Sequence, residues 1–260
     1  MTNSYFDNNV FNKGKAFIPF ITAGYPTLED TERFILKMEE AGADLIEIGI
    51  PFSDPIAEGP VIQHASTMAL KAGTTLDKIF DMVKKVREKS QVPLVFMTYI
   101  NPIFKYGCEK FYAKCNELNI RGTILPDVPF EEKKEFEDVA KLYDVDIISL
   151  VTPASNNRIR KIAEASRGFI YVVSSMGVTG TRDEITTDLG AIDEIIRKTT
   201  ITKTAIGFGI NTLAQAKEIS KHSDGIIVGS AIIKIIDKYG SNSDEQIFDF
   251  VQSMKKAINS

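Results

Sequence analysis

The sequence predicts an α/β fold, a (β/α)8 TIM barrel in which residues 1–260 form a single domain with extra helices at the N- and C-termini. Short runs rich in β-forming residues alternate with amphipathic helical stretches along the chain. The strand–helix unit recurs roughly every 25–30 residues over about 250 residues, which is typical of such barrels. No linker rich in proline, glycine or serine divides the chain. An open, doubly wound sheet is the alternative fold, because the order of the strands cannot be read from the sequence.

Eight runs are predicted to be strands because they are short and rich in residues that favour β structure. They are residues 16–22, 44–50, 93–98, 122–126, 146–151, 169–174, 203–207 and 225–229. Helices are predicted where apolar residues recur three or four positions apart, as in residues 27–42, 130–143 and 212–223. The extra helices are expected at about residues 2–12 and 243–258.

The composition is that of an ordinary soluble globular protein, with 43% hydrophobic and 25% charged residues. A net charge of -4 and a pI near 5.4 argue against nucleic-acid binding, which needs a basic surface. Neither a signal peptide nor a transmembrane segment is recognisable, so we expect no membrane contact and a cytoplasmic location. Cys108 and Cys115 are expected to be reduced thiols. Because His64 and His222 are the only histidines, no metal site is predicted.

Glu47 stands in the apolar run DLIEIGI, where a carboxylate is unfavourable unless it is paired or functional. Side chains alternate along a strand, so Ile46, Ile48 and Ile50 share the face that packs on helices, and Glu47 points into the barrel. Barrel active sites lie at the carboxyl ends of the strands. Burial there raises the pKa of a carboxyl toward neutrality, as a general acid–base catalyst requires. The alternative is a structural glutamate paired with lysine or arginine.

Glycine-rich sequences follow the last three predicted strands, at residues 174–182 (SSMGVTGTR), 207–211 (GFGIN) and 229–233 (GSAII). Glycine lets backbone N–H groups approach an anion closely, and a helix that begins at Ser230 adds its N-terminal dipole. Barrels often bind phosphate in the loops after strands 7 and 8. We therefore predict a phosphate site there, although a single glycine more often marks a turn.

Three aromatic residues, Phe20, Tyr99 and Tyr171, lie in or at the ends of predicted strands. Core packing explains any one of them. Together they can line a flat aromatic pocket.

Longer motifs carry a resemblance to a known family. They read, in chain order, FIPFITAGYP, IEIGIPFSDPIAEGPVIQ, MTYINPIFKYG, ILPDVPFEE, GVTGTR, GFGI and VGSAIIKII. From about residue 16 to residue 238 the chain resembles the α subunits of tryptophan synthase. The resemblance implies a lyase that needs no pyridoxal phosphate and cleaves indole-3-glycerol phosphate to indole and glyceraldehyde 3-phosphate. It also implies a β-subunit partner in an αββα tetramer.

The resemblance implies a role for each matching residue. Glu47 would carry protons to indole C3 and from the substrate hydroxyl. Glu58 would accept the indole N–H and stabilise positive charge on the ring. Tyr171 would lie near the glycerol chain. The side chains that would wall the indole ring are Phe20, Tyr99, Ile124 and Leu150, and Thr179 would close over the site. The residues that would bind the phosphate are Gly180, Gly209, Gly229 and Ser230. The residues in loops that would face the β subunit are Asp54, Asn101 and Asp127.

Glu58 departs from the family pattern, because it stands in AEGP where aspartate is usual, and its carboxylate therefore reaches one methylene further. A free-standing indole-producing lyase and a chiefly regulatory subunit that activates a β enzyme are the alternative functions. The pair Glu47 and Glu58 argues against the regulatory subunit. Another phosphate-binding barrel, such as a metal-dependent epimerase, would need more histidines at strand ends than this chain has.

Overall fold

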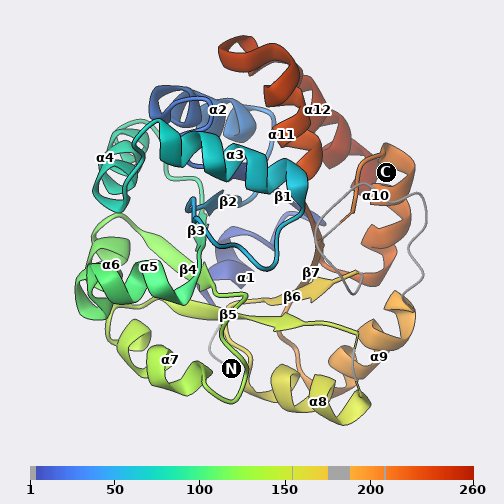
Figure 1. The fold of residues 1–260 in the computed structure, drawn as a ribbon. Coiled ribbons are helices and arrows are strands. Elements are labelled where there is room, and N and C mark those ends of the chain that lie inside the picture. Colours follow the sequence, from blue (N-terminus) through green and yellow to red (C-terminus); the bar gives the residue numbers. More distant parts are fainter. Residues whose placement is uncertain (1–3, 154, 175–187, 208) are drawn as a thin grey trace.

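The computed structural model describes residues 4–153, 155–174, 188–207 and 209–260, and its strands close into a parallel barrel (Figure 1). Each strand pairs with the next along the chain, and the last pairs with the first. The (β/α)8 barrel is therefore confirmed, and the open sheet is wrong. The described strands are β1 (Ala16–Thr22), β2 (Ile46–Gly49), β3 (Leu94–Met97), β4 (Ile120–Ile124), β5 (Asp146–Val151), β6 (Ile170–Val173), β7 (Thr204–Gly207) and β8 (Gly225–Val228).

Helices surround the barrel and cover the outer face of its strands (Figure 1). Their apolar faces are buried against the strands, as the three-to-four spacing of apolar residues predicts. The described α-helices are α1 (Tyr5–Asn9), α2 (Leu28–Glu40), α3 (Pro60–Lys71), α4 (Leu76–Arg87), α5 (Ile100–Tyr106), α6 (Cys108–Glu117), α7 (Lys133–Leu142), α8 (Asn156–Ala165), α9 (Leu189–Thr199), α10 (Leu213–Ile219), α11 (Ser230–Tyr239) and α12 (Asp244–Ile258), and 3-10 turns follow α10 (Ser220–His222) and α11 (Gly240–Asn242).

Several predicted boundaries differ from the structure by a few residues, and two of these differences have an identifiable cause. The first helix is shorter than expected: a capping box formed by Ser4 and Asp7 begins α1, which ends at Asn9 in an asparagine-rich segment of low helix propensity. Strand β4 begins at residue 120 instead of 122, because the register between β3 and β4 shifts at an irregularity beside Leu94. The predicted C-terminal helix is confirmed as α12.

The amino-terminal end of the barrel is closed by aromatic packing. Phe6 of α1 and Phe11 lie edge-on against Phe169, with ring centroids 5.4 and 5.9 Å apart. Just before β1, the backbone N–H of Lys15 donates to the side chain of Asn259 at 2.9 Å. Both ends of the described chain are thus fixed at this end of the barrel, which leaves the carboxyl ends of the strands for a site.

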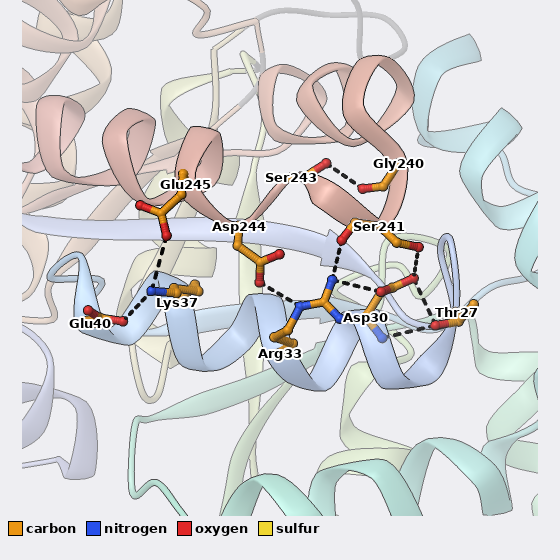
Figure 2. Close-up of polar contacts among 10 residues, drawn as sticks. All are labelled: Thr27, Asp30, Arg33, Lys37, Glu40, Gly240, Ser241, Ser243, Asp244 and Glu245. Carbon is orange, nitrogen blue, oxygen red and sulfur yellow. Dashed lines mark hydrogen bonds and ion pairs between the residues drawn. The ribbon is translucent and has the colours of Figure 1, made fainter.

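A polar cluster joins α2 to the segment that contains α12 (Figure 2). Arg33 forms ion pairs with Asp30 at 2.9 Å and with Asp244 at 2.7 Å, and also donates to the carbonyl of Ser241. The hydroxyl of Ser241 donates to Asp30 at 2.7 Å. Because Asp30 is only 4% exposed, this cluster supplies the hydrogen bonds that a buried carboxylate needs. It fastens the C-terminal helix to the first helix after β1.

Cys108 and Cys115 are free thiols, as predicted, and burial raises the pKa of each. Within the described ranges, no helix combines the length and apolarity needed to cross a membrane.

Candidate active site

Glu47 lies in β2 between buried isoleucines and is itself only 1% exposed. Its register partners are Phe20 on β1 and Val95 on β3, and it borders a cavity at the carboxyl end of the barrel, as predicted. No lysine or arginine of the described residues forms an ion pair with it, and its Oε2 atom is buried without a hydrogen-bond partner. Burial, with a smaller contribution from the charge of Glu58, raises the pKa of Glu47 from 4.5 to about 8. The carboxyl is therefore mostly protonated at neutral pH, which argues against the structural alternative.

Glu58 reaches the same cavity from the loop between β2 and α3, and is 8% exposed. The hydroxyl of Tyr99 donates a hydrogen bond to its carboxylate. The backbone N–H groups of Ile56 and Ala57 donate to the same Tyr99 oxygen, each at 2.9 Å. Burial raises the pKa of Glu58, and the hydrogen bond from Tyr99 opposes that rise. The cavity thus contains one carboxyl whose neutral form is favoured, Glu47, and one held by a donor that favours its charged form.

Tyr171 of β6 is 4% exposed and lies on the inner face of the barrel, level with Leu150 of β5 and Ala205 of β7. A Cβ on Gly207 would lie only 2.3 Å from the Tyr171 hydroxyl, so glycine at this position leaves room for the ring. Burial, followed by the charge of Glu47, raises the pKa of Tyr171 well above its usual value. The phenol therefore keeps its proton and can donate it in a hydrogen bond.

The apolar part of the cavity wall comes from several strands and loops. Phe20 covers two glycines: a Cβ on Gly49 would lie 2.5 Å from its ring, and one on Gly229 would lie 3.1 Å away. The cavity measures about 30 Å³, which is room for about one water molecule. The apolar lining residues are Phe20, Ile62, Met97, Ile210 and Ile227.

The residues predicted to wall an indole ring are not all brought together. Phe20 lines the cavity, whereas Tyr99 lies behind Glu58, where its ring stacks on Phe52 with centroids 5.0 Å apart. Ile124 and Leu150 share the inner face with Met97 and Tyr171 through the strand register, but the described lining does not include them.

Four apolar lining residues were absent from the predicted site. Met97 and Ile227 could have been found, because they occupy inward positions near the ends of predicted strands. Ile62 lies in the first turn of α3 and Ile210 in the loop after β7, and no local pattern distinguishes them from core residues.

The glycines predicted to bind phosphate border the same cavity. Gly209 follows β7 with a φ of +77°, a conformation that favours glycine. Gly229 precedes Ser230, the first residue of α11, and no side chain caps that helix. The N–H of Ile232 in its first turn donates to the carbonyl of Gly229 at 2.9 Å, and no hydrogen bond within the described residues engages the N–H groups of Ser230 and Ala231, which can therefore donate to an anion. Thr179 and Gly180, also predicted to act here, lie outside the described residues.

Asp54, Asn101 and Asp127 follow β2, β3 and β4, so these three residues lie along one rim of the barrel, at the carboxyl ends of its strands. Two large apolar side chains on the same rim are exposed: Ile56 to 68% and Phe104 to 60%. Exposed apolar side chains beside polar ones are typical of surfaces that contact another protein.

Comparisons with known proteins identify the family that this chain resembles over nearly its full length. Residues 6–259 match the family profile described as tryptophan synthase alpha chain. The tryptophan synthase alpha chain of Lacticaseibacillus casei is 44% identical over 251 residues, which cover 96% of this chain and 94% of the relative. That of Caldanaerobacter subterraneus subsp. tengcongensis is 46% identical over 247 residues, covering 94% of each chain.

Two solved structures are also similar. Mycobacterium tuberculosis tryptophan synthase superposes with a TM-score of 0.88 at 28% identity, covering 98% of this chain and 96% of the other. A structure of the Pyrococcus furiosus tryptophan synthase α2β2 complex has a TM-score of 0.85 at 34% identity, covering 94% of this chain and 99% of the other.

Proposed function

The chain belongs to the tryptophan synthase alpha chain family, lyases that cleave indole-3-glycerol phosphate in tryptophan biosynthesis, and we propose that Glu47 and Glu58 perform the cleavage. The proposal is carried by the carboxyl of Glu47, which is buried against the cavity, receives no hydrogen bond at Oε2 from the described residues and has a pKa raised to about 8. A carboxylic acid that keeps its proton at neutral pH can donate it to a weak base such as an aromatic carbon.

Glu47 acts first as the acid and then as the base. Its proton is transferred to C3 of the indole ring, which becomes tetrahedral and carries a positive charge shared with the ring nitrogen. The bond between C3 and the glycerol chain then breaks, and its electrons restore the aromatic ring of indole. The Glu47 carboxylate takes the proton of the adjacent hydroxyl as that carbon becomes the aldehyde of glyceraldehyde 3-phosphate. Glu47 gives one proton to C3 and takes one from the hydroxyl, so it ends the reaction protonated, as it began, and no other acid is required.

Glu58 stabilises the positive charge that develops during these steps. Its carboxylate accepts a hydrogen bond from the indole N–H, and the charge on the ring is then paired with a fixed anion in a site of low polarity. The hydrogen bond from Tyr99 supports the ionised form of Glu58. Because both carboxyls border one cavity, a catalytic role is favoured over a purely regulatory subunit.

Backbone N–H groups hold the phosphate of the substrate. Gly209, Gly229 and Ser230 border the end of the cavity formed by β7 and β8, and α11 begins there. Lys203 does not contribute to this site, because it precedes β7 and pairs at 3.1 Å with Asp224, which precedes β8, at the amino-terminal end of the barrel. Tyr171 lies between this end and Glu47, where its hydroxyl can contact the glycerol chain.

The rim that carries Asp54, Asn101 and Asp127 is our proposed contact with a tryptophan synthase β subunit in an αββα tetramer. The exposed side chains of Ile56 and Phe104 support it, as does the similarity to a chain of the Pyrococcus furiosus α2β2 complex. In a free-standing indole-producing lyase, the same rim would have no partner. Turnover measured with increasing amounts of a β subunit separates the two: acceleration supports the tetramer, and unchanged turnover supports the free-standing enzyme.

Glu47→Gln tests the proposed chemistry. Glutamine has nearly the same shape but cannot give up or accept the proton, so we expect indole production to fall at least ~10²-fold. Glu32→Gln is the matched control, because Glu32 pairs with Lys89 at 2.7 Å away from the cavity and should leave turnover unchanged. Circular dichroism checks that each variant is folded. A folded Glu47→Gln protein with activity within threefold of wild type would remove Glu47 from the mechanism.

A further inference from the structure

The hydroxyl of Tyr99 joins the carboxylate of Glu58 to the backbone of the loop that carries it. It donates to the carboxylate and accepts from the N–H groups of Ile56 and Ala57, both at 2.9 Å. We propose that Tyr99 is a positioning residue that holds the Glu58 carboxylate where it meets the indole nitrogen of the substrate. This inference rests on the proposed role of Glu58.

Tyr99 is itself firmly placed. It is 2% exposed, its ring stacks on Phe52, and it is the residue that precedes α5. Directly after it, the N–H of Ile100 donates to both carboxylate oxygens of Asp127, at 3.2 and 3.1 Å. An acidic side chain at the start of a helix stabilises that helix. The hydroxyl that contacts Glu58 is therefore fixed by contacts from the loops after β2 and β4.

Glu58 needs such an anchor more than an aspartate would. Its side chain has one more rotatable bond, so more conformational freedom must be lost before the carboxylate is in place. The loop that carries it also contains the exposed Ile56. One hydrogen-bonded oxygen that contacts residues 56, 57 and 58 together fixes the carboxylate relative to this loop. The contact thus offsets the added freedom of the longer side chain.

The hydrogen bond from Tyr99 also lowers the pKa of Glu58 and so favours its charged form. Asp127, in the loop after β4, is an acidic neighbour that raises the pKa of Glu58, whereas Glu47 on β2 keeps its proton at neutral pH. A negative neighbour disfavours a second negative charge, as does burial. The donor from Tyr99 and the nearby backbone N–H groups of Ala57 and Glu58 act in the opposite direction. Removing the hydroxyl should therefore shift Glu58 toward its neutral form.

Tyr99→Phe in the isolated chain tests the proposal, because it deletes only the hydroxyl. A lost hydrogen bond to a charged group should lower kcat roughly ten- to a hundredfold while KM changes little. The acid limb of the kcat–pH profile, which reports the group that must be ionised, should move to higher pH. Tyr106→Phe is the matched control, since Tyr106 also donates to a carboxylate, that of Asp77 at 2.7 Å, and this variant should behave as wild type.

A double-mutant cycle decides whether Tyr99 acts through Glu58. In a Glu58→Gln background, Tyr99→Phe should have almost no further effect on kcat, because the group it positions has lost its charge. Equal factors in the two backgrounds would overturn the proposal, and so would a raised KM with unchanged kcat, which would make Tyr99 part of the indole wall. Failure of the proposed function itself would be seen separately, as full activity of Glu58→Gln alone or of Glu47→Gln.

Discussion

Replacing Glu47 with glutamine should alter how the free energy of unfolding depends on pH. In the unfolded chain this carboxyl titrates at its ordinary pKa of 4.5, whereas in the folded protein its pKa is about 8. Between these values the folded state binds more protons than the unfolded state. Stability must therefore fall as the pH rises through this window, the reverse of the behaviour of a carboxylate in an ion pair. Glutamine does not titrate, so the variant lacks this contribution.

The size of the effect follows from the two pKa values. Each tenfold difference in proton affinity corresponds to about 1.4 kcal/mol. Raising the pH from 5 to 8 should therefore cost the wild-type protein roughly 3–4 kcal/mol relative to Glu47→Gln. Groups that do not interact with Glu47 titrate equally in both proteins and cancel in the difference. The unpaired amide of the glutamine adds a constant that does not depend on pH.

Urea unfolding followed by circular dichroism at pH 5, 6, 7 and 8 measures this difference. Glu32→Gln serves again as control, and its difference from wild type should vary by less than about 1 kcal/mol, as expected for an ion pair with an exposed lysine. If the difference between wild type and Glu47→Gln were equally flat, Glu47 would not hold its proton in the folded protein, and its role as the acid would lose its basis.

Three further changes test other parts of the structure. Glu58→Gln should lower kcat roughly ten- to a hundredfold in steady-state kinetics, whereas Glu58→Asp should keep substantial activity because it retains the charge. Gly229→Val should raise KM more than Lys234→Ala in α11 does, because a side chain at position 229 meets Phe20 within 3.1 Å and blocks the backbone cradle; the reverse order would favour a phosphate site built from lysine. Arg33→Ala should lower the free energy of unfolding by about 1–2 kcal/mol, because Asp30 stays buried with fewer partners. Thermal unfolding that matched wild type would show that the cluster in Figure 2 adds little stability.

The order of the strands and helices could be predicted because each element carries its own periodic signal. The inward direction of Glu47 followed from a single alternating strand and needed no knowledge of distant residues. The start of β4 could not be predicted in the same way, because it depends on an irregular register with Leu94 on a neighbouring strand. Local sequence patterns therefore indicate whether a segment is a helix or a strand, whereas the ends of a strand depend on how it pairs with its neighbours.

The site could be predicted only in part, because some of its contacts join residues that are distant in the chain. Its carboxyls and glycines lie at strand ends, where the barrel fold itself places function. The contact of Tyr99 with Glu58 joins residues 41 positions apart in the chain, and no local motif reports it. The sequence therefore predicts Tyr99 only as part of the cavity wall, whereas in the structure its hydroxyl contacts the loop that carries Glu58. Ile62 and Ile210 enter the cavity through helix and loop geometry that the sequence pattern does not encode.

The hydrogen bond between Lys15 and Asn259 bears on how the protein can be handled. Lys15 precedes β1, so this contact lies at the amino-terminal end of the barrel, opposite the candidate active site. A tag or surface linker joined after Ser260 therefore leaves the barrel on the side away from the cavity. A chain immobilised in this way presents Glu58, the glycine loops and the rim around Asp54 to the solution, where substrate and a β subunit can reach them.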